Sequence, residues 1–135
     1  MATKIFVNLP VKNLNKSIDF FTNLGYSFNA QFTDEKATCM IIAEDIYVML
    51  LMEPFFKSFI QKDICDTATS LETIMALSCE SRGAVDAMLA KVLKAGGTEP
   101  NAAQDLGFMY SRGFYDLDGH YWEFFWMEEN NKSNS

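Results

Sequence analysis

The chain has 135 residues, of which 49% are hydrophobic, and its formal net charge is −7. This length suits one compact unit with a real core, and the hydrophobic content argues against a disordered protein. The acidic balance, without any basic cluster, argues against nucleic acid and against an anionic membrane surface as partners. No apolar run is long enough to span a bilayer.

The three cysteines, Cys39, Cys65 and Cys79, are widely spaced and form no metal-binding pair. Cys39 and Cys79 lie in apolar strand patterns, so we interpret them as core residues with reduced thiols. Residues 1–4 lead straight into a strand pattern and show no signal-peptide signature. Together these features predict a cytoplasmic protein.

The first half of the chain predicts a strand, a helix and three more strands. Ile5–Leu9 alternates like a strand, which Pro10 is expected to end. Asn13 is a suitable N-cap for a helix over about Leu14–Leu24, and Gly25 stands where a C-cap glycine belongs. A three-strand meander should follow, over Tyr26–Phe32, Ala37–Ala43 and Ile46–Met52. This first module covers about residues 4–52.

Residues 53–72 break this pattern, and we interpret them as a connector. Pro54 cannot continue a central strand. One or two turns of amphipathic helix are predicted by the spacing of Phe55, Phe56, Phe59 and Ile60. This apolar stretch could be a lid over a ligand site, a dimer contact or core beneath a loop. We favour packing or a dimer contact over a moving lid.

The same order of elements recurs in a second module over about residues 73–127. Thr73–Glu80 predicts a strand, and Ser81 can cap a helix that Gly96 and Gly97 close. Three extended segments should follow, over about Glu99–Asp105, Phe108–Asp116 and His120–Met127. Residues 128–135 form a polar tail that we expect to be frayed.

This repetition carries the prediction of the fold. Each module alone would expose one face of its sheet, so two modules side by side would form a curved mixed sheet around a cup, with helices on the outside. The expected class is α+β, with two tandem βαβββ modules in a single domain over residues 1–135. Whether the modules pair within one chain or are exchanged between two chains stays open.

Strand alternation assigns side chains to the two faces of this sheet. Ile5, Val7 and Leu9 should face the helices, and so should Met75, Leu77 and Cys79. The cup would then be lined by Phe6, Asn8, Ile74, Ala76, Ser78, Tyr121, Glu123 and Phe125, and in the fourth strand by Tyr47, Met49 and Leu51.

The stretch Tyr115–Met127 holds the clearest candidate for chemistry. Asp118-Gly119 predicts a tight type I′ hairpin turn. Glu123 then interrupts an aromatic run, and taking a carboxylate out of water is costly unless it is paired or protonated. Glu123 therefore lies either on the wet face of an edge strand or in a pocket, as a ligand anchor or a general acid or base.

Three segments of the chain resemble one known family. Val11-Lys12-Asn13-Leu14 resembles its opening helix, and Ala76-Leu77-Ser78 resembles the start of its second half. Asp116-Leu117-Asp118-Gly119 resembles the acidic turn that precedes its metal-binding glutamate, here Glu123. On these segments the chain resembles the vicinal oxygen chelate superfamily, which includes glyoxalases, extradiol dioxygenases and bleomycin-resistance proteins.

The resemblance implies four metal-ligand positions, two in each module, usually occupied by His, Gln or Glu. The positions that match them here are Phe6, Met49, Ile74 and Glu123. Phenyl and alkyl groups offer no lone pair, and a thioether is a poor ligand for a hard or borderline divalent ion. The single histidine, His120, is more simply a turn or surface residue than a ligand. We therefore expect no cofactor and no metal site, with Glu123 the only matching ligand.

A cup without metal is an apolar cavity with a few polar groups, which is typical of a small-molecule site. Asn8 and Glu123 could contact a ligand or simply hydrogen-bond each other. Arg112 could bind a carboxylate or phosphate, or pair with Asp116 or Asp105 as scaffold. The candidate ligand-binding residues are Phe6, Asn8, Met49, Ile74, Tyr110, Arg112, Tyr121 and Glu123, with Glu123 the best candidate acid or base.

The expected function is small-molecule binding by a glyoxalase/bleomycin-resistance-like protein that does not use the family's metal. The resemblance also implies a homodimer. The alternative is a divalent-metal-dependent lyase, isomerase or dioxygenase of the same superfamily with atypical ligands. A third hypothesis is a scaffold whose own side chains fill the cup. No Ser/His/Asp or Cys/His nucleophile set is present, because His120 is the only imidazole.

Overall fold

A computed structural model describes residues 3–129 of the chain. The chain divides into two compact units, Met1–Leu71 (unit 1) and Glu72–Ser135 (unit 2). Most of the predicted tail, residues 130–135, lies outside the described part. Within residues 3–129, no helix combines the length and the apolar character needed to cross a bilayer.

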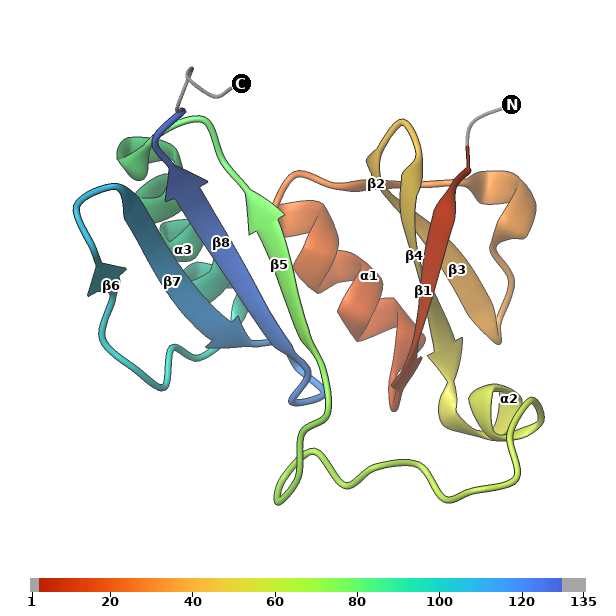
Figure 1. Ribbon diagram of the computed structural model, residues 1–135. Coiled ribbons are helices and arrows are strands. Elements are labelled where there is room, and N and C mark those ends of the chain that lie inside the picture. The colour runs from red at the N-terminus through yellow and green to blue at the C-terminus, as the bar shows by residue number, and fades with distance from the viewer. Residues whose placement is uncertain (1–2, 130–135) are drawn as a thin grey trace. The chain divides into compact units, whose positions relative to one another are not determined.

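Unit 1 contains a four-stranded mixed sheet in the order β1-β4-β3-β2. β1 and β4 run parallel, whereas β3 is antiparallel to both of its neighbours (Figure 1). The strands are β1 (Ile5–Val11), β2 (Ser27–Phe28), β3 (Ala37–Ala43) and β4 (Ile46–Met52). The predicted bounds of the last two strands are confirmed.

The core of unit 1 lies between this sheet and helix α1 (Leu14–Asn23). The Asn13 side chain caps the helix, because its Oδ1 accepts the Lys16 N–H at 3.1 Å. Phe20 and Phe21 are buried, as are Leu9 of β1 and Leu50 of β4. Alternation in β1 is therefore as predicted from Val7 onward, but Ile5, its first residue, is 54% exposed and not covered.

Two expectations for unit 1 are wrong. Pro10 does not end β1, which continues to Val11; an outer strand of a sheet tolerates proline because one of its edges makes no ladder hydrogen bonds. The strand expected over Tyr26–Phe32 is only the short β2, followed by the 3-10 helix Ala30–Phe32. There the Asn29 side chain accepts the Gln31 N–H at 3.0 Å, so a local turn replaces strand pairing.

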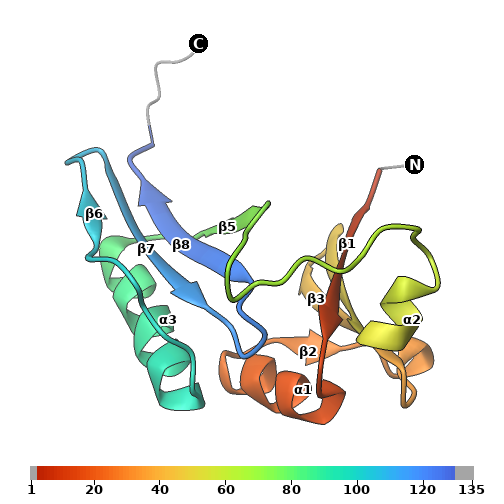
Figure 2. The ribbon, with the colours of Figure 1, turned by 90° about the horizontal axis from the view of Figure 1, so that it is seen from below.

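A short helix, α2 (Glu53–Lys57), follows β4 directly. Pro54 lies in its first turn, where the missing N–H costs nothing. α2 packs against β1 and β4 (Figure 2), and the Lys12 ammonium pairs with the Glu53 carboxylate at 2.9 Å. Helix α2, the first part of the connector, is therefore packed on the sheet of its own unit, while a dimer contact stays a prediction.

Unit 2 repeats the topology of unit 1, with the order β5-β8-β7-β6. β5 and β8 are parallel, and the other neighbours are antiparallel (Figure 1). The prediction of two tandem βαβββ modules is confirmed. The elements are β5 (Ile74–Ser78), helix α3 (Arg82–Ala95), β6 (Gln104–Asp105), β7 (Met109–Tyr115) and β8 (Tyr121–Met127).

Helix α3 covers one face of β7 and β8 and makes the core of unit 2 (Figure 2). Ser81 caps it, since its Oγ accepts the Ala84 N–H at 3.0 Å, and Gly96 ends it at φ +109°. The buried side chains of this core come from the helix and both strands: Val85, Leu89, Val92, Phe114, Trp122 and Phe124.

The strand expected over Glu99–Asp105 is reduced to Gln104–Asp105, with one isolated bridge between Thr98 and Tyr115. Pro100 has no N–H to donate to a ladder, which agrees with the interruption. The segment between Thr98 and Gln104 therefore runs as a loop, while these two residues pair with Tyr115 and Ser111 of β7.

The β7–β8 connection is not the expected two-residue type I′ turn. Gly119 N–H donates to the Asp116 carbonyl at 3.1 Å, so Asp118 and Gly119 are the last two residues of a four-residue turn. The buried Asp116 carboxylate accepts N–H groups of Asp118, His120 and the Trp122 indole at 2.8–3.0 Å. His120 directly follows this turn, and it is buried rather than on the surface.

Candidate functional site

A hollow of about 350 Å³ opens on the sheet of unit 2, and Glu123 lies in its lining. β8 alternates between buried Trp122 and Phe124, which pack under α3, and Tyr121 and Glu123, which point to the other face. The lining residues are Asn101, Ala102, Ala103, Gln104, Ser111, Gly113, Tyr121 and Glu123, which we call the Glu123 hollow.

Gly113 makes room for this hollow. It is the register partner of Glu123 in the β7–β8 ladder, so the position opposite the carboxylate carries no side chain. The Tyr121 ring lies across it, and a Cβ at position 113 would clash with the Tyr121 hydroxyl oxygen unless that side chain moved. Glycine at this position therefore permits the close approach of the neighbouring side chain.

Three polar groups of the hollow have no partner among the described residues of unit 2. Ser111 is only 4% exposed. Within residues 72–129, no hydrogen bond or ion pair engages the Ser111 hydroxyl, the Tyr121 hydroxyl or the Glu123 carboxylate. Since buried polar groups are normally satisfied, this arrangement suits water or a ligand that supplies complementary groups.

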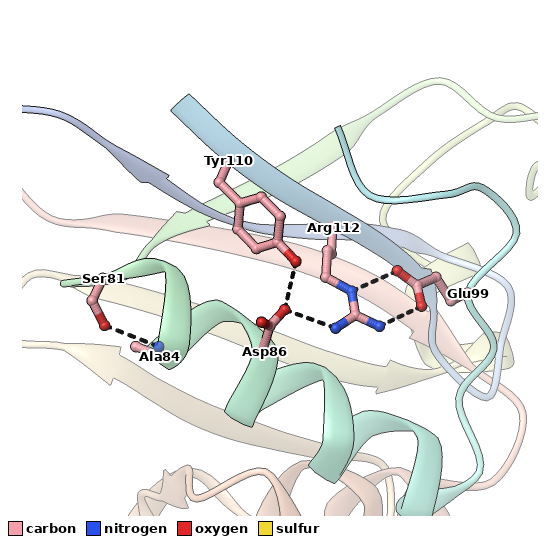
Figure 3. A network of polar contacts seen from close by, with 6 residues as sticks. All are labelled: Ser81, Ala84, Asp86, Glu99, Tyr110 and Arg112. Atoms are coloured by element: carbon pink, nitrogen blue, oxygen red, sulfur yellow. Dashed lines mark hydrogen bonds and ion pairs between the residues drawn. The ribbon is translucent and has the colours of Figure 1, made fainter. Parts of the chain in front are cut away.

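One wall of the hollow is held by a polar network behind the sheet (Figure 3). The Arg112 guanidinium donates to both oxygens of Glu99 at 2.7 and 2.8 Å, and to Asp86 of α3 at 2.9 Å. Glu99 stands just before the loop 101–104 that lines the hollow. The Tyr110 hydroxyl also donates to Asp86 at 2.6 Å, and these two donors lower the pKa of that carboxyl group.

Tyr110 and Arg112 therefore do not line the hollow in which Glu123 lies. Their register partners are Trp126 and Phe124, so both side chains point to the α3 face, opposite the hollow. Arg112 does act as scaffold, but its partners are Glu99 and Asp86 rather than Asp116 or Asp105. Asp105 is engaged by Arg82 at 2.8 and 3.0 Å.

Unit 1 brings three other candidates onto neighbouring strands. Asn8 of β1 is the register partner of Met49 of β4, and Phe6 stacks on Tyr47 with ring centroids 4.7 Å apart. Asn8 donates its amide to the Phe6 carbonyl at 3.1 Å. In unit 2, Ile74 starts β5 and is 56% exposed. A hydrogen bond between Asn8 and Glu123 stays a prediction.

The residues at the family's ligand positions do not match a metal site. Phe6, Met49 and Ile74 contribute a phenyl ring, a thioether and an alkyl group, and only Glu123 carries an oxygen donor. Within the described part of the chain, no group of three or more His, Cys, Asp or Glu side chains could hold an ion.

Sequence reasoning missed Ser111, Gly113 and the loop 101–104 as parts of the hollow. One signal could have identified Gly113, because a lone glycine inside a strand pattern often marks a close approach. Ser111 and the loop carry no such signal, since their place depends on the register between β6, β7 and β8.

Comparison with known proteins agrees with this architecture. Residues 3–43 match the family described as bleomycin resistance protein-like N-terminal. A hypothetical protein from S. aureus is 28% identical, with a TM-score of 0.79 over 93% of this chain and 94% of that one. No curated protein sequence matches the chain.

More distant solved structures share the fold. A glyoxalase/bleomycin resistance protein/dioxygenase family enzyme from Burkholderia phytofirmans PsJN is 11% identical, with a TM-score of 0.78 over 93% of this chain and 99% of that one. A genomically encoded fosfomycin resistance protein from Listeria monocytogenes is 20% identical, with a TM-score of 0.67 over 93% of both chains.

The repeated βαβββ topology and these matches define the class: this is the fold of the vicinal oxygen chelate superfamily, as the sequence resemblance predicted. Within that superfamily the fold is of the glyoxalase/bleomycin-resistance type.

Proposed function

We propose that this protein binds a small molecule in the Glu123 hollow and does so without a divalent metal. The observation that carries the proposal is a carboxylate without an ion-pair partner among the described residues of unit 2, placed beside two hydroxyl groups that also lack partners there. A carboxylate only accepts hydrogen bonds when ionised, whereas hydroxyls donate and accept. The ligand class that suits this set is a small polar molecule with an amine, amidine or other N–H donor.

The proposed site is more polar than the apolar cup expected from the sequence. Asn101 and Gln104 add amide groups to the lining, and Ser111, the register partner of Phe125, adds a hydroxyl group. Glu123 serves as the anchor in this proposal. As the only acidic group in the lining, it is also the candidate acid or base should the ligand react.

Three features support a metal-independent site. Three of the four family ligand positions carry groups that do not bind divalent ions, and the described residues contain no alternative cluster. The chain holds a single histidine, and its backbone N–H donates to Asp116 in the hairpin turn. The alternative, a metal-dependent lyase, isomerase or dioxygenase, would need ligands from outside these positions.

We further propose a cytoplasmic homodimer that interacts with neither nucleic acid nor membranes. The net charge of −7 disfavours polyanionic partners, and all three cysteines are unpaired. In unit 1 the outer strand β1 exposes Ile5 and Phe6, which are 54% and 48% accessible, so its edge presents apolar surface that a second copy could cover. Sedimentation equilibrium of the full chain tests the dimer, and a monomer across the micromolar range would contradict it.

The site is tested by screening small amines, amidines and amino alcohols against the full chain by thermal shift, followed by calorimetry of the hits. Glu123→Gln should weaken the best hit at least tenfold while leaving the unfolding temperature unchanged, because the charge is lost but the shape is kept. Glu80→Gln, an exposed carboxylate outside the hollow, is the matched control and should bind like wild type. Equal affinity in Glu123→Gln would contradict the proposal.

The proposal that the site works without a divalent metal is tested by the metal content of tag-free protein and by thermal shifts in Ni, Zn, Fe(II), Mn and Mg. We expect substoichiometric metal and no shift that depends on Glu123. A stoichiometric ion whose binding is abolished in Glu123→Ala would replace this proposal with the metal-dependent enzyme.

A further inference from the structure

A second hollow, of about 370 Å³, lies within unit 1 and has a different character from the Glu123 hollow. It opens where β1, β4 and the segment after the first turn of α2 meet, and it contains no charged side chain. We call it the aromatic hollow; its lining is Asn8, Leu51, Phe56, Phe59 and Ile60.

The floor of the aromatic hollow presents one hydrogen-bond acceptor on an apolar surface. Leu51 is 3% exposed and closes the bottom. The Asn8 Nδ2 donates to the Phe6 carbonyl at 3.1 Å, and because a carbonyl oxygen only accepts, this bond fixes which end of the amide is which. Asn8 Oδ1 is left as an acceptor with no partner among the described residues of unit 1.

The aromatic wall is held in place before any ligand arrives. Beyond α2 the turn continues, since Phe59 N–H donates to the Phe56 carbonyl at 3.1 Å and Ile60 N–H to the Lys57 carbonyl at 3.2 Å. The Phe55 and Phe59 rings meet edge to face at 5.0 Å. A preorganised wall loses little conformational entropy on binding.

Phe59 nevertheless remains 67% exposed, although its neighbours hold it in position. An aromatic ring fixed at the mouth of a hollow leaves apolar surface in water, which a ligand can cover. The hydrophobic gain from that burial would be the main driving force for binding.

The lining determines the class of ligand. Because the lining contains no charged side chain, it disfavours an ionic ligand, whose loss of hydration no opposite charge would compensate. The phenyl rings of Phe56 and Phe59 favour an aromatic ligand. The single hydrogen-bond acceptor, Asn8 Oδ1, favours a ligand that carries one hydrogen-bond donor. The volume lies within the range of small-molecule pockets.

We propose that the aromatic hollow is a second binding site, which takes a neutral aromatic molecule carrying one N–H or O–H donor. The ring packs against Phe56 and Phe59, and the donor binds Asn8 Oδ1. All residues that line this site belong to unit 1.

Indole and benzothiophene make a matched pair of probes, since they share a shape and differ in the N–H group. We expect indole to bind the full chain two- to tenfold more tightly than benzothiophene, which is about the worth of one net hydrogen bond. Asn8→Ala should abolish this preference and leave benzothiophene binding in place. Chemical-shift titration by NMR measures both affinities.

Phe59→Ala should weaken both probes at least fivefold, and Phe59→Leu should restore part of the loss because apolar bulk returns. Phe32→Ala, another exposed phenylalanine of unit 1 outside the hollow, should bind like wild type. Equal affinity of indole and benzothiophene for wild type would overturn the proposal. So would unchanged binding in Phe59→Ala.

Discussion

Gly113 lies directly opposite Glu123 in the β7–β8 ladder, and the Tyr121 ring rests on it. The hollow beside Glu123 therefore depends on the absence of a Cβ atom at position 113. The backbone of Gly113 does not have a positive φ, so its requirement is one of space rather than of conformation. The three heavy atoms nearest to a Cβ placed there all belong to the Tyr121 side chain.

Gly113→Ala should consequently destabilise the protein by about 1–3 kcal/mol, the usual cost of inserting a methyl group into packed surroundings. It should also displace Tyr121 from the lining of the hollow. Urea denaturation of Gly113→Ala, Tyr121→Ala and the double variant measures the coupling between the two positions.

In the Tyr121→Ala background the cost of Gly113→Ala should nearly vanish, because the clashing ring is gone. Similar costs in both backgrounds would show that the neighbouring backbone, not Tyr121, requires the glycine.

At the scale of elements, the Arg112 network joins β7, α3 and the segment that leads into the hollow (Figure 3). Arg112 and Glu99 are 21% and 16% exposed at their side chains, so the pair is largely shielded from solvent. Glu99 raises the pKa of Arg112, which keeps the guanidinium charged at any physiological pH. The network should therefore determine how firmly the loop 101–104 is held.

Arg112→Ala would leave the Glu99 carboxylate without its partner, and we expect a loss of about 2–4 kcal/mol in the free energy of unfolding. Amide exchange should accelerate most at residues 98–104. Lys4→Ala removes an exposed ion pair with Asp45 and should leave stability close to that of wild type. Denaturant unfolding with exchange mass spectrometry measures both effects; unchanged exchange at 98–104 would contradict the positioning role.

The sequence predicted elements well where local signals and burial agree. β3 and β4 follow their apolar patterns residue by residue, and Asn13 and Ser81 cap the helices they were expected to cap. The predictions failed where a side chain satisfies the backbone locally. Asn29 builds a 3-10 turn in place of a strand, as its side chain accepts the Gln31 N–H.

The site was harder to predict because it depends on register across strands. Alternation within β8 was enough to put Glu123 on the face away from Trp122. The face of Tyr110 and Arg112 could not be deduced in the same way, because it depends on the length and shape of the β7–β8 connection. Asp116 shapes that connection through contacts with Asp118, His120 and Trp122 that no local pattern reveals.

At the scale of the whole molecule, the two units share one topology but have separate cores. Leu50 of unit 1 and Leu89 of unit 2 are both fully buried. Leu89→Ala should cost about 2–5 kcal/mol, as core truncations do. Because Leu89 belongs to the core of unit 2, amide exchange should accelerate mainly within residues 74–127.

Leu50→Ala is the matched variant and should accelerate exchange mainly within residues 5–52. Uniform acceleration over the whole chain by either variant would show instead that the chain opens only as one cooperative body.

Both tryptophans of the chain, Trp122 and Trp126, belong to β8. The first donates its indole N–H to Asp116, and the second stands 5.1 Å from the Arg82 guanidinium. Fluorescence excited selectively at tryptophan therefore originates only in unit 2, and unit 1 contributes no tryptophan emission. An unfolding curve recorded by tryptophan emission follows one half of the protein, whereas circular dichroism follows both. Comparing the two signals separates the halves without any introduced label.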